Sequence, residues 1–575
     1  MHRFLLILCV ALGCWYTSHD SWLAILCFVL YGVLLHRNSD DLTAGWLLIL
    51  ILAPRSIWLF SDPMVLSDDV YRYAWDGYLV SQGISPYLAT PHEWVAQGGM
   101  MPLQVSWLNS QDYFSVYPPL TQAIFGALWC INPTIEGFIT SLRLAIVGME
   151  TLCLLGIAWL RHRGIALHSR NALLVLAHPL IFVGGAWGLH TETLLLPWLL
   201  ALVFFPRRML SIGTLAGALI KLYPILFVLS PGMRVRNKIL VCLVFGLILL
   251  TFVGPAGLPK VLESLQLYQE TFSFWSIPYL SLKEIILWLG VEDYEWWTGM
   301  VMYILAIGGG VIGMYWKGWI TAAEGLAWMI GCLTLMSRTI HPWYLIPFLV
   351  VATGTRLQNV AYFWSTAALL SYGWYADPSV SVIWTSACIP VVVSVLMIRP
   401  VVLTHSLRHR ARNKAALVGP HVTGASVFDF GGGEGYLGPL VQEMGRTYAW
   451  GDPLASNRQD GDHPESKADT VLLIYVLHHV EDVEEVLQRA VDRARSRVII
   501  VETIPSKAWQ RHLYPWLDQL LFWVRFGVPS STIRYRSVKA WTDALSSYGA
   551  VRVVHHIQQG FHHKAVFTLD LHSRT

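Results

Sequence analysis

The chain contains 575 residues with a mass of 64.8 kDa, which is enough for two or three ordinary domains. Hydrophobic residues make up 55% of it, charged residues only 13%, and the mean hydropathy is +0.49, so an ordinary soluble protein is excluded. The net charge of +3 is too small to indicate a nucleic-acid partner, whereas 27 Trp residues are typical of proteins that meet membrane interfaces.

The charged residues are distributed unevenly along the chain. Residues 1–400 contain 20 basic residues (Lys and Arg) and 20 acidic residues (Asp and Glu). The much shorter segment 401–575 contains 20 basic and 17 acidic residues. This contrast predicts a polytopic α-helical membrane domain over residues 1–400 and a soluble domain over residues 425–575. Residues 401–424 between them are basic and rich in His, as expected of a juxtamembrane linker on anionic membrane lipids.

Apolar runs of spanning or near-spanning length recur through the first 400 residues and predict about 11 to 14 transmembrane helices. The runs lie near 4–16, 21–35, 42–60, 138–160, 171–188, 193–206, 209–221, 223–231, 239–254, 297–316, 321–337, 343–353, 360–374 and 381–398. Arg and Lys residues fall in alternate connections, and placing those connections in the cytoplasm satisfies the positive-inside rule. Segments 61–137 and 255–296 then face outward. We expect an integral protein of a bacterial-type inner (cytoplasmic) membrane with its soluble domain in the cytoplasm.

The outward segment 61–137 carries the densest polar chemistry of the apolar part. It contains Ser67-Asp68-Asp69-Val70-Tyr71-Arg72-Tyr73-Ala74-Trp75-Asp76-Gly77, where carboxylates, an Arg and aromatic rings stand together. A carboxylate in such a loop is suited to take the proton of a hydroxyl nucleophile, and two adjacent carboxylates are suited to a divalent cation. Asp68 and Asp69 are therefore candidates for a catalytic base and for metal ligands. A helix cap made by Asp68 is the structural alternative.

Further motifs follow this stretch in order. They are Gly83-Ile84-Ser85-Pro86-Tyr87, Tyr117-Pro118-Pro119-Leu120, Arg143, Gly188-Leu189-His190-Thr191-Glu192, Lys221-Leu222-Tyr223-Pro224 and His341-Pro342-Trp343-Tyr344. Together the motifs cover about residues 60–380 and resemble those of GT-C-type membrane glycosyltransferases. The most similar branch is the polyprenyl-phosphate-mannose-dependent mannosyltransferases.

This resemblance implies a polyprenyl-phosphate-linked sugar donor and a glycan or lipid-linked acceptor outside the cytoplasm. It favours Asp69 over Asp68 as the residue that takes the acceptor's proton. Because the leaving group is a phosphate, cations are expected near the same face. The candidates for binding the donor phosphate or the acceptor are Arg72, His190, Glu192, Lys221, Arg338 and His341. The alternatives are lone cations that reach for lipid headgroups and an interfacial pair of His190 with Glu192.

One predicted span also contains two opposite charges. Arg143 and Glu150 are seven residues apart, two helical turns along one face. Ionisable groups inside a membrane are costly unless they are functional or satisfy each other. We expect these two to be structural.

The soluble part opens with a strand, a glycine turn and a helix. Ala425-Ser426-Val427-Phe428-Asp429 predicts a short buried strand, and Phe430-Gly431-Gly432-Gly433-Glu434-Gly435-Tyr436 predicts a turn where backbone approaches a ligand closely. A dinucleotide fingerprint needs Gly at position 436, where Tyr stands. The spacing instead resembles class I S-adenosylmethionine-dependent methyltransferases, which implies an α/β Rossmann-like domain with that cofactor.

The methyltransferase resemblance also implies site residues. The cofactor residues are Asp429, Gly431, Gly433, Gly435 and, for the ribose hydroxyls, Asp452. Asp460 and Asp462 are the two candidates for the acidic residue beside the adenine of the cofactor. They lie in a short stretch, where the third strand of the family is expected to be degraded. Ala468 to Val480 matches the family's fourth strand and its turn, and Arg497 to Glu502 a fifth strand.

Two parts of this domain leave alternatives open. His478 and His479 follow the fourth strand, where they are either a methyl-transfer base or packing residues at the substrate rim. Trp509 to Phe526 places Trp and Leu at helical spacing. This predicts either a core or lid helix or a face that lies in the membrane interface.

The sequence thus predicts a bifunctional enzyme with external glycosyl transfer, most specifically mannosyl transfer, and cytoplasmic methyl transfer. The alternatives are a lipid-linked-sugar transporter and a glycosyltransferase with an inactive, cofactor-sensing methyltransferase-like module. Transporters place polar residues at mid-membrane, whereas here they cluster outside the apolar runs, which favours the enzyme.

Overall fold

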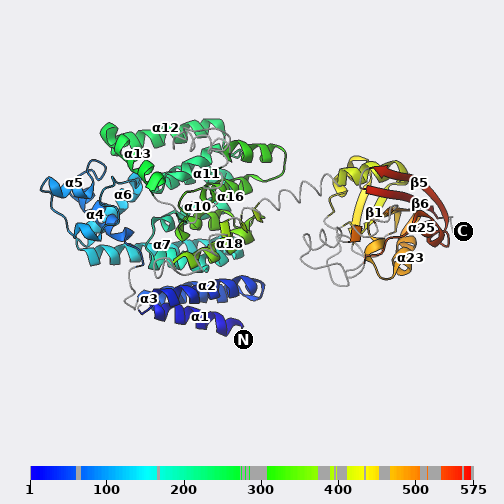
Figure 1. Ribbon diagram of the computed structural model, residues 1–575, viewed down its shortest axis with the longest axis horizontal. Helices are drawn as coiled ribbons and strands as arrows, with labels where there is room; N and C mark the ends of the chain where they lie inside the picture. Colours follow the sequence, from blue (N-terminus) through cyan, green and yellow to red (C-terminus); the bar gives the residue numbers. More distant parts are fainter. Residues whose placement is uncertain are drawn as a thin grey trace. The chain divides into compact units, whose positions relative to one another are not determined.

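The structure is a computed structural model, and the description covers most of the chain. The described residues are 2–17, 19–59, 66–164, 169–271, 274, 279, 284, 307–372, 389–390, 392–393, 396–397, 411–432, 435–451, 467–505, 510, 514–515, 533–559 and 562–571. The chain divides into two compact units, Met1–Val401 and Val402–Thr575 (Figure 1). Each unit is described separately below.

The N-terminal unit is built from helices. They are α1 (His2–Tyr16), α2 (Ser21–Arg37), η1 (Ser39–Asp41), α3 (Ala44–Leu59), α4 (Asp69–Ser81), α5 (Pro91–Ala96), η2 (Val105–Trp107), α6 (Pro119–Ile131), α7 (Ile135–His162), α8 (Ser169–Leu176), α9 (Pro179–Phe182), η3 (Val183–Trp187), η4 (Thr191–Leu195), α10 (Leu196–Phe204), α11 (Pro206–Ile220), η5 (Tyr223–Leu229), α12 (Val235–Phe252), α13 (Gly254–Thr271), α16 (Ala322–Leu335), η6 (Pro342–Leu345), α17 (Ile346–Val351), α18 (Gln358–Ala368) and η7 (Leu369–Tyr372). Many are shorter than the apolar runs that contain them.

Proline explains much of this shortening. Pro lacks the backbone N–H that a helix interior needs, so it is favoured in the first turn of a helix. α6, α10, α11, η5, η6 and α17 each have Pro in their first two positions. At Pro179 the chain bends by 54° between α8 and α9, and the ring nitrogen Nδ1 of His178 accepts the N–H of Leu180 there. Continuous apolar sequence is therefore divided into short helices with polar residues at the breaks.

Two described helices are long and apolar enough to cross a membrane. They are α7, with 28 residues, and α12, with 18, and the bent pair Ser169–Leu176 and Pro179–Trp187 is a third if it counts as one span. The remaining apolar helices with 10–17 residues include α1, α2, α6 and α16. The expected 11 to 14 spans thus exceed what the described helices support and remain a prediction.

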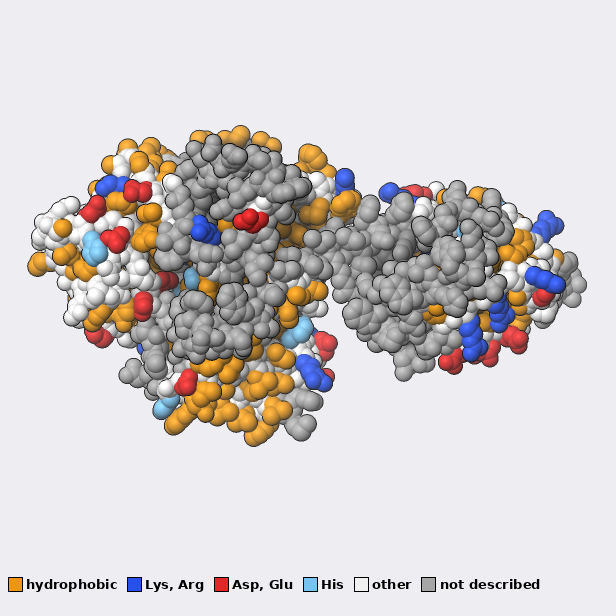
Figure 2. Space-filling view, viewed as in Figure 1, with side chains coloured by type: hydrophobic (Ala, Val, Ile, Leu, Met, Phe, Trp, Pro, Cys, Tyr) orange, Lys and Arg blue, Asp and Glu red, His pale blue; other side chains and the backbone are white. Residues whose placement is uncertain are grey.

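The surface of the N-terminal unit is unusually apolar. On α12, Leu243 and Leu247 have 67% and 65% of their surface exposed, and Leu152 on α7 has 69%. Figure 2 shows hydrophobic side chains gathered over this unit. Exposed apolar area of this extent is typical of a surface that contacts lipid or a partner.

The Glu150 carboxylate has a different partner from the one that the sequence suggested. Its Oε2 lies 2.5 Å from Nε of Arg55 on α3, and the two side chains are 1% and 4% exposed. Arg55 also donates to the carbonyl oxygens of Ile51 and Leu176. The pair therefore joins α3 to α7 and not two turns of α7, so the role is structural as expected but Arg143 is not the partner.

The two segments that we expect to face outward pack against each other. The Phe114 N–H donates to Oγ of Ser264 on α13 at 2.7 Å, and the ring centroids of Tyr113 and Tyr268 are 4.9 Å apart. The described parts of these two segments, residues 66–137 and 255–271, thus pack together into one outer layer.

The C-terminal unit contains one six-stranded sheet with the order β2-β1-β3-β4-β6-β5. Its elements are η8 (Gly419–His421), β1 (Ser426–Phe430), α22 (Gly438–Glu443), β2 (Thr447–Gly451), β3 (Ala468–Ile474), η9 (Leu477–His479), α23 (Val483–Arg493), β4 (Ala494–Thr503), α25 (Val538–Leu545), β5 (Ala550–Gln559) and β6 (His562–Asp570). The first four strands of that order are parallel, and β6 is antiparallel to β4 and β5. The expected α/β fold is confirmed, and the antiparallel β5–β6 pair is an addition that sequence reasoning missed.

Part of the expected linker belongs to this unit. Residues 411–418 are helical, and Ala415, Val418 and Val422 join the core on one face of the sheet, together with Val427 and Leu472. Because alternate residues of β1 and β3 point to opposite faces, Phe428 and Val471 enter a second core on the other face. Only the part of the linker before residue 411 lies outside the described residues.

Candidate functional site

In the N-terminal unit, the breaks between short helices bring polar side chains together. Asp69 opens α4, His190 precedes η4, Lys221 ends α11 and His341 precedes η6. These four predicted residues come from distant parts of the sequence, and each of them lies at the end of a helix. The contacts below show that they form one cluster.

Asp69 is the accessible carboxylate of this cluster. Its Oδ1 accepts a hydrogen bond from Nδ2 of Asn109 at 2.8 Å, and its Oδ2 lies 3.6 Å from Nδ1 of His190. The side chain is 28% exposed. Burial raises its pKa, but the contacts with His190 and Asn109 and the nearby His341 outweigh that effect and lower the pKa to about 2. Asp69 is therefore ionised, and one oxygen is already oriented by an amide that sequence reasoning missed.

Two imidazole rings and an indole form a stack beside Asp69. The rings of His190 and Trp343 are 3.6 Å apart at an interplanar angle of 12°, and those of His341 and Trp343 are 4.4 Å apart at 9°. His190 is fully buried, and neither ring nitrogen makes a hydrogen bond within the described residues. Burial lowers the pKa of His341 to about 4 although Asp69 opposes this. His341 is thus neutral near pH 7, so its expected part in binding the donor phosphate or the acceptor, which stays a prediction, would use a ring N–H and not a positive charge.

Glu192 and Lys221 form an ion pair, which replaces the expected pair of His190 with Glu192. Lys221 Nζ lies 2.8 Å from Glu192 Oε1, and the side chains are 21% and 1% exposed. The ammonium also lies 5.6 Å and 6.0 Å from the ring centroids of Tyr117 and Tyr344. Lys221 therefore remains the partly exposed cation of the cluster among aromatic rings.

Arg72 has a structural position. It is 3% exposed, its Nε donates to Asp76 Oδ1 at 2.9 Å, and its Nη1 donates to the carbonyl oxygens of Ser110 and Tyr113. The guanidinium thus joins α4 to the following outer loop, and its expected binding of a donor or acceptor stays a prediction. Asp76 was not a predicted site residue.

Asp68 and Arg338 lie at the edge of the cluster. Asp68 occupies the position before α4 but makes no side-chain cap hydrogen bond. The backbone carbonyl of Arg338 accepts the N–H of Phe274, which places it three residues before His341 in a segment paired with the outer layer. The structure shows no contact between these two residues and Asp69 among its described hydrogen bonds.

The tentative metal site at Asp68 and Asp69, with water completing the shell of the ion, stays a prediction. Across the described residues, no group of three or more His, Cys, Asp or Glu side chains is arranged to hold a metal ion. The Asp69 oxygens instead face an amide donor and an imidazole.

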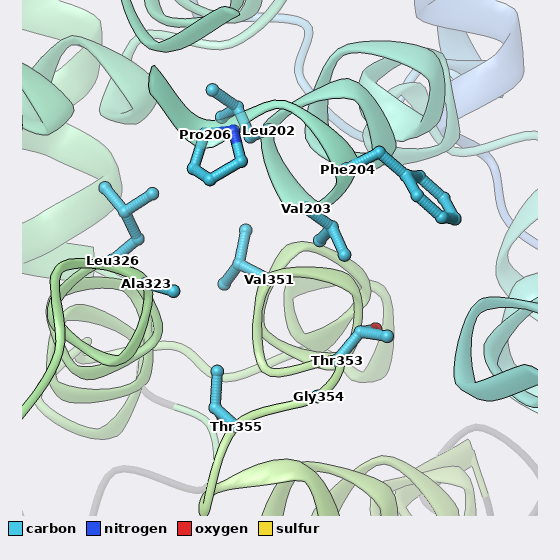
Figure 3. A pocket seen from close by; sticks show the side chains of 10 residues that line it. All are labelled: Leu202, Val203, Phe204, Pro206, Ala323, Leu326, Val351, Thr353, Gly354 and Thr355. Atoms are coloured by element: carbon cyan, nitrogen blue, oxygen red, sulfur yellow. The ribbon is translucent and has the colours of Figure 1, made fainter. Parts of the chain in front are cut away.

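One cavity of this unit lies away from the predicted site residues. It has a volume of about 190 Å³ and is lined mainly by apolar side chains from the end of α10, the start of α16 and the turn after α17 (Figure 3). None of the predicted site residues lines it. It is not the site of polar chemistry.

In the C-terminal unit, the glycine turn follows β1 as expected. Gly431 and Gly435 have φ angles of 91° and 70°, which other residues rarely adopt. A Cβ at Gly431 would lie 2.6 Å from Val476 Cγ2, so the turn also packs closely on the segment after β3. Backbone in this conformation leaves a cradle without side chains, which fits the methionine and ribose parts of S-adenosylmethionine. Gly433 and Asp452 lie outside the described residues, as do Asp460 and Asp462.

Asp429 lies at the carboxyl end of β1 beside this cradle. It is 4% exposed, and the hydroxyl of Tyr448 donates to its Oδ2 at 3.0 Å. Burial raises its pKa, against the smaller opposing effects of Lys414 and Tyr448. A buried carboxylate with spare acceptor capacity suits the ammonium group of an amino-acid ligand.

His478 is held by a carboxylate that sequence reasoning did not single out. Its Nδ1 lies 2.6 Å from Glu502 Oε2, while Glu502 Oε1 accepts the N–H groups of Val476 and Leu477. Glu502 is fully buried and His478 is 3% exposed. His478 thus fastens the turn after β3, which is the packing alternative. The half-buried His479 follows it on the outer side, and most of the Trp509–Phe526 segment lies outside the described residues.

Comparisons with known proteins place these features in a family. Residues 403–556 match a family model described as "Methyltransferase domain". Magnesium protoporphyrin IX methyltransferase from Synechocystis PCC 6803 with bound SAH is 15% identical, the match covers 29% of this chain and 83% of that one, and the TM-score is 0.22. A putative O-methyltransferase from Nostoc punctiforme PCC 73102 is 16% identical, with 30% and 59% covered and a TM-score of 0.22.

Neither similarity transfers a substrate to this chain, because the identities and the TM-scores are low. No curated protein matches the chain. The family match, the parallel sheet and the glycine turn agree on one assignment for the second unit. Residues 403–556 of this chain therefore form a methyltransferase domain.

Proposed function

We propose that this protein is a membrane enzyme with two activities. The N-terminal unit transfers a sugar, specifically mannose, from a polyprenyl-phosphate donor to an acceptor outside the cytoplasm. The C-terminal unit transfers a methyl group from S-adenosylmethionine in the cytoplasm. The first activity rests on one observation: Asp69, His190, Glu192, Lys221 and His341 come from separate motifs and lie in one cluster beneath the outer layer.

Lys221 and Asp69 act directly in the proposed transfer. The acceptor hydroxyl oxygen forms a bond to the anomeric carbon, the bond from that carbon to the phosphate oxygen breaks, and the electron pair leaves with the phosphate. Lys221, the partly exposed cation, stabilises the phosphate's charge. Asp69 accepts the hydroxyl proton. A carboxylate whose pKa is about 2 is a weak base, so it takes the proton late, when the new bond has made the hydroxyl acidic.

His190 supports Asp69 in this scheme. The imidazole lies behind the carboxylate, fully buried and stacked on Trp343, so it touches Asp69 and not the solvent. Its Nδ1 lies 3.6 Å from Oδ2 of the carboxylate, while Asn109 donates a hydrogen bond to Oδ1. A base that is held on both sides keeps its geometry during the reaction, which reduces the reorganisation that catalysis requires.

The first prediction tests Asp69 in the full-length chain, purified in detergent and incubated with polyprenyl-phosphate mannose labelled in the sugar. Lipids and glycans extracted from the expressing cells serve as acceptors, and donor consumption is measured with and without them. Asp69→Asn keeps the shape of the side chain and removes its basicity. It should lower the rate by about 10²–10⁴-fold.

Asp68→Asn is the matched control, because Asp68 is the adjacent carboxylate and makes no cap hydrogen bond. It should keep most of the activity. Equal rates for Asp69→Asn and the wild type would remove Asp69 from the mechanism. A wild-type chain that consumes no donor under any condition would contradict the glycosyltransferase proposal itself.

A further inference from the structure

The segment that joins the two units also contributes a charged residue to the second one. Lys414 lies in the helical residues 411–418, which sequence reasoning placed in a linker. Ala415 and Val418 of the same helix are 6% and 1% exposed and belong to the core on one face of the sheet. Lys414 is therefore held in a fixed place by its neighbours and is not part of a free tether.

Lys414 lies at the point where the strand order of the sheet reverses. The chain runs from β1 outward to β2 and then returns to β3 on the other side of β1. In open α/β sheets, ligands bind at such a switch point, outside the carboxyl ends of the two strands. Lys414 Nζ lies 5.7 Å from the ring centroid of Tyr475, which directly follows β3. Its charge also acts on the carboxyl of Asp429, at the carboxyl end of β1.

The backbone at Tyr475 supports the view that this point is functional. Its φ angle is +59°, a left-handed conformation that is rare for a residue with a bulky side chain. The conformation is maintained by the Tyr475 N–H, which donates to the Val501 carbonyl at 2.8 Å. Strained residues of this kind persist where the surroundings determine them, and they concentrate at binding sites.

A carboxylate and an ammonium at one crevice are complementary to an amino-acid zwitterion. S-Adenosylmethionine carries such a zwitterion, because its methionine part has an α-ammonium and an α-carboxylate group. We propose that Lys414 binds the α-carboxylate of the cofactor while Asp429 binds its α-ammonium group. The proposal rests on the C-terminal unit binding this cofactor. It makes the helical residues 411–418 of the second unit a part of the cofactor site.

Three ligands separate this role from a purely structural one. S-Adenosylhomocysteine carries both charged groups, its decarboxylated analogue keeps only the ammonium, and 5′-methylthioadenosine has neither. Their dissociation constants are measured by calorimetry on the full-length chain in detergent. Lys414→Met should weaken S-adenosylhomocysteine by about tenfold or more, as expected for loss of a charge-assisted contact, and leave the other two within about twofold.

Matched variants complete the experiment. Lys414→Arg keeps the charge and should retain most of the affinity. Arg412→Met removes an exposed cation from the same helix and should change nothing. Asp429→Asn should weaken both ligands that carry the ammonium and spare 5′-methylthioadenosine. Thermal unfolding of each variant shows that the chain is still folded.

Three outcomes would overturn the role of Lys414. Equal weakening of all three ligands by Lys414→Met would mean that Lys414 only supports the fold. Equal weakening of the two ligands that carry the ammonium group would mean that Lys414 acts through Asp429. Unchanged binding of S-adenosylhomocysteine would mean that Lys414 does not contact the carboxylate. If the wild-type chain bound none of the three ligands, the cofactor assignment of the whole unit would fail, and the proposal with it.

Discussion

At the residue scale, the charge states in the N-terminal cluster constrain the chemistry more than the residue types do. Asp69 is ionised because His190 and Asn109 stabilise its carboxylate in spite of partial burial. His341 is neutral because burial outweighs the attraction of Asp69. Lys221 is the partly exposed cation of the cluster, and it forms an ion pair with the buried Glu192. The cluster therefore combines one weak base with one cation, as a transfer from a phosphate leaving group requires.

A pH profile follows from these values. The pKa of Asp69 is about 2 and that of His341 is about 4, so neither group changes its charge between about pH 8 and about pH 5. Glycosyl transfer should therefore change less than about threefold through these two groups across that interval. The measurement is kcat/KM for the labelled donor, with the unfolding temperature recorded at each pH. A tenfold fall by about pH 5 without unfolding would show that these charge states are wrong.

At the element scale, short helices and strands are joined by a few buried polar contacts. Arg55 and Glu150 connect α3 to α7. Arg72 connects α4 to the outer loop through Asp76 and the Ser110 carbonyl. In the second unit, Glu502 holds the turn after β3, and Val476 of that turn packs on Gly431. The contacts of Arg72 and of Glu502 position elements that carry site residues, so damage to either should reach the site through that element.

The buried ion pair between α3 and α7 gives a stability prediction. Arg55→Met leaves the Glu150 carboxylate buried without its partner, which should destabilise the protein by about 3–5 kcal/mol. The double variant Arg55→Met with Glu150→Met removes both charges and should recover most of that loss. Unfolding temperatures in detergent measure both effects. If the single and the double variants were equally destabilised, the energy would come from packing and not from the unpaired charge.

The glycine turn gives a cofactor prediction. In Gly431→Ala the new Cβ meets Val476 at 2.6 Å and the φ angle of 91° becomes strained, which should cost about 1–3 kcal/mol and weaken S-adenosylhomocysteine binding. Gly445→Ala is the control, because Gly445 has a φ of 74° but nothing lies within 4 Å of its Cβ position. The control should lower stability without lowering affinity in calorimetry. An equal loss of affinity in both variants would mean that strain, and not the cradle, decides binding.

At the scale of the whole molecule, two compact units of different character share one chain. The N-terminal unit exposes apolar side chains on α7 and α12, whereas charged residues are concentrated in the C-terminal part. Lipid is the solvent that suits the first surface, and water suits the second. We infer from the positive-inside pattern that the outer layer around α4 and α13 faces away from the cytoplasm and that the methyltransferase domain faces into it.

Cysteine labelling tests this orientation. Cys130 is exposed at the end of α6, in the segment expected outside. In intact cells it should react with a membrane-impermeant maleimide, and Cys130→Ser should abolish that signal. In the Cys130→Ser background, Ser547→Cys places an exposed thiol in the second unit, which has no natural Cys. It should react only after permeabilisation, and labelling of Ser547→Cys in intact cells would contradict the topology.

Local patterns in the sequence determined the two-part division, the strand and glycine turn of the methyltransferase domain, and most members of the polar cluster. Hydropathy, charge density and short spacings are properties of adjacent residues, so they can be read before any fold is known. The pairing of charges was decided only by the tertiary structure. Glu150 pairs with Arg55, 95 residues away, and Asp69 is held by Asn109, 40 residues away.

The same limit applies to residues whose surroundings the sequence did not reveal. Arg72 looked like a ligand-binding cation, and residues 411–424 looked like a free linker, because composition describes a side chain but not its surroundings. In the fold, Arg72 is enclosed by Asp76 and two carbonyl groups, and Lys414 lies over Tyr475. A buried charge takes the partner that packing brings within reach, since leaving it unpaired costs several kcal/mol. The partner of a buried charge therefore depends on the tertiary structure. For this reason the sequence predicted the residue types of the cluster but not the contacts between them.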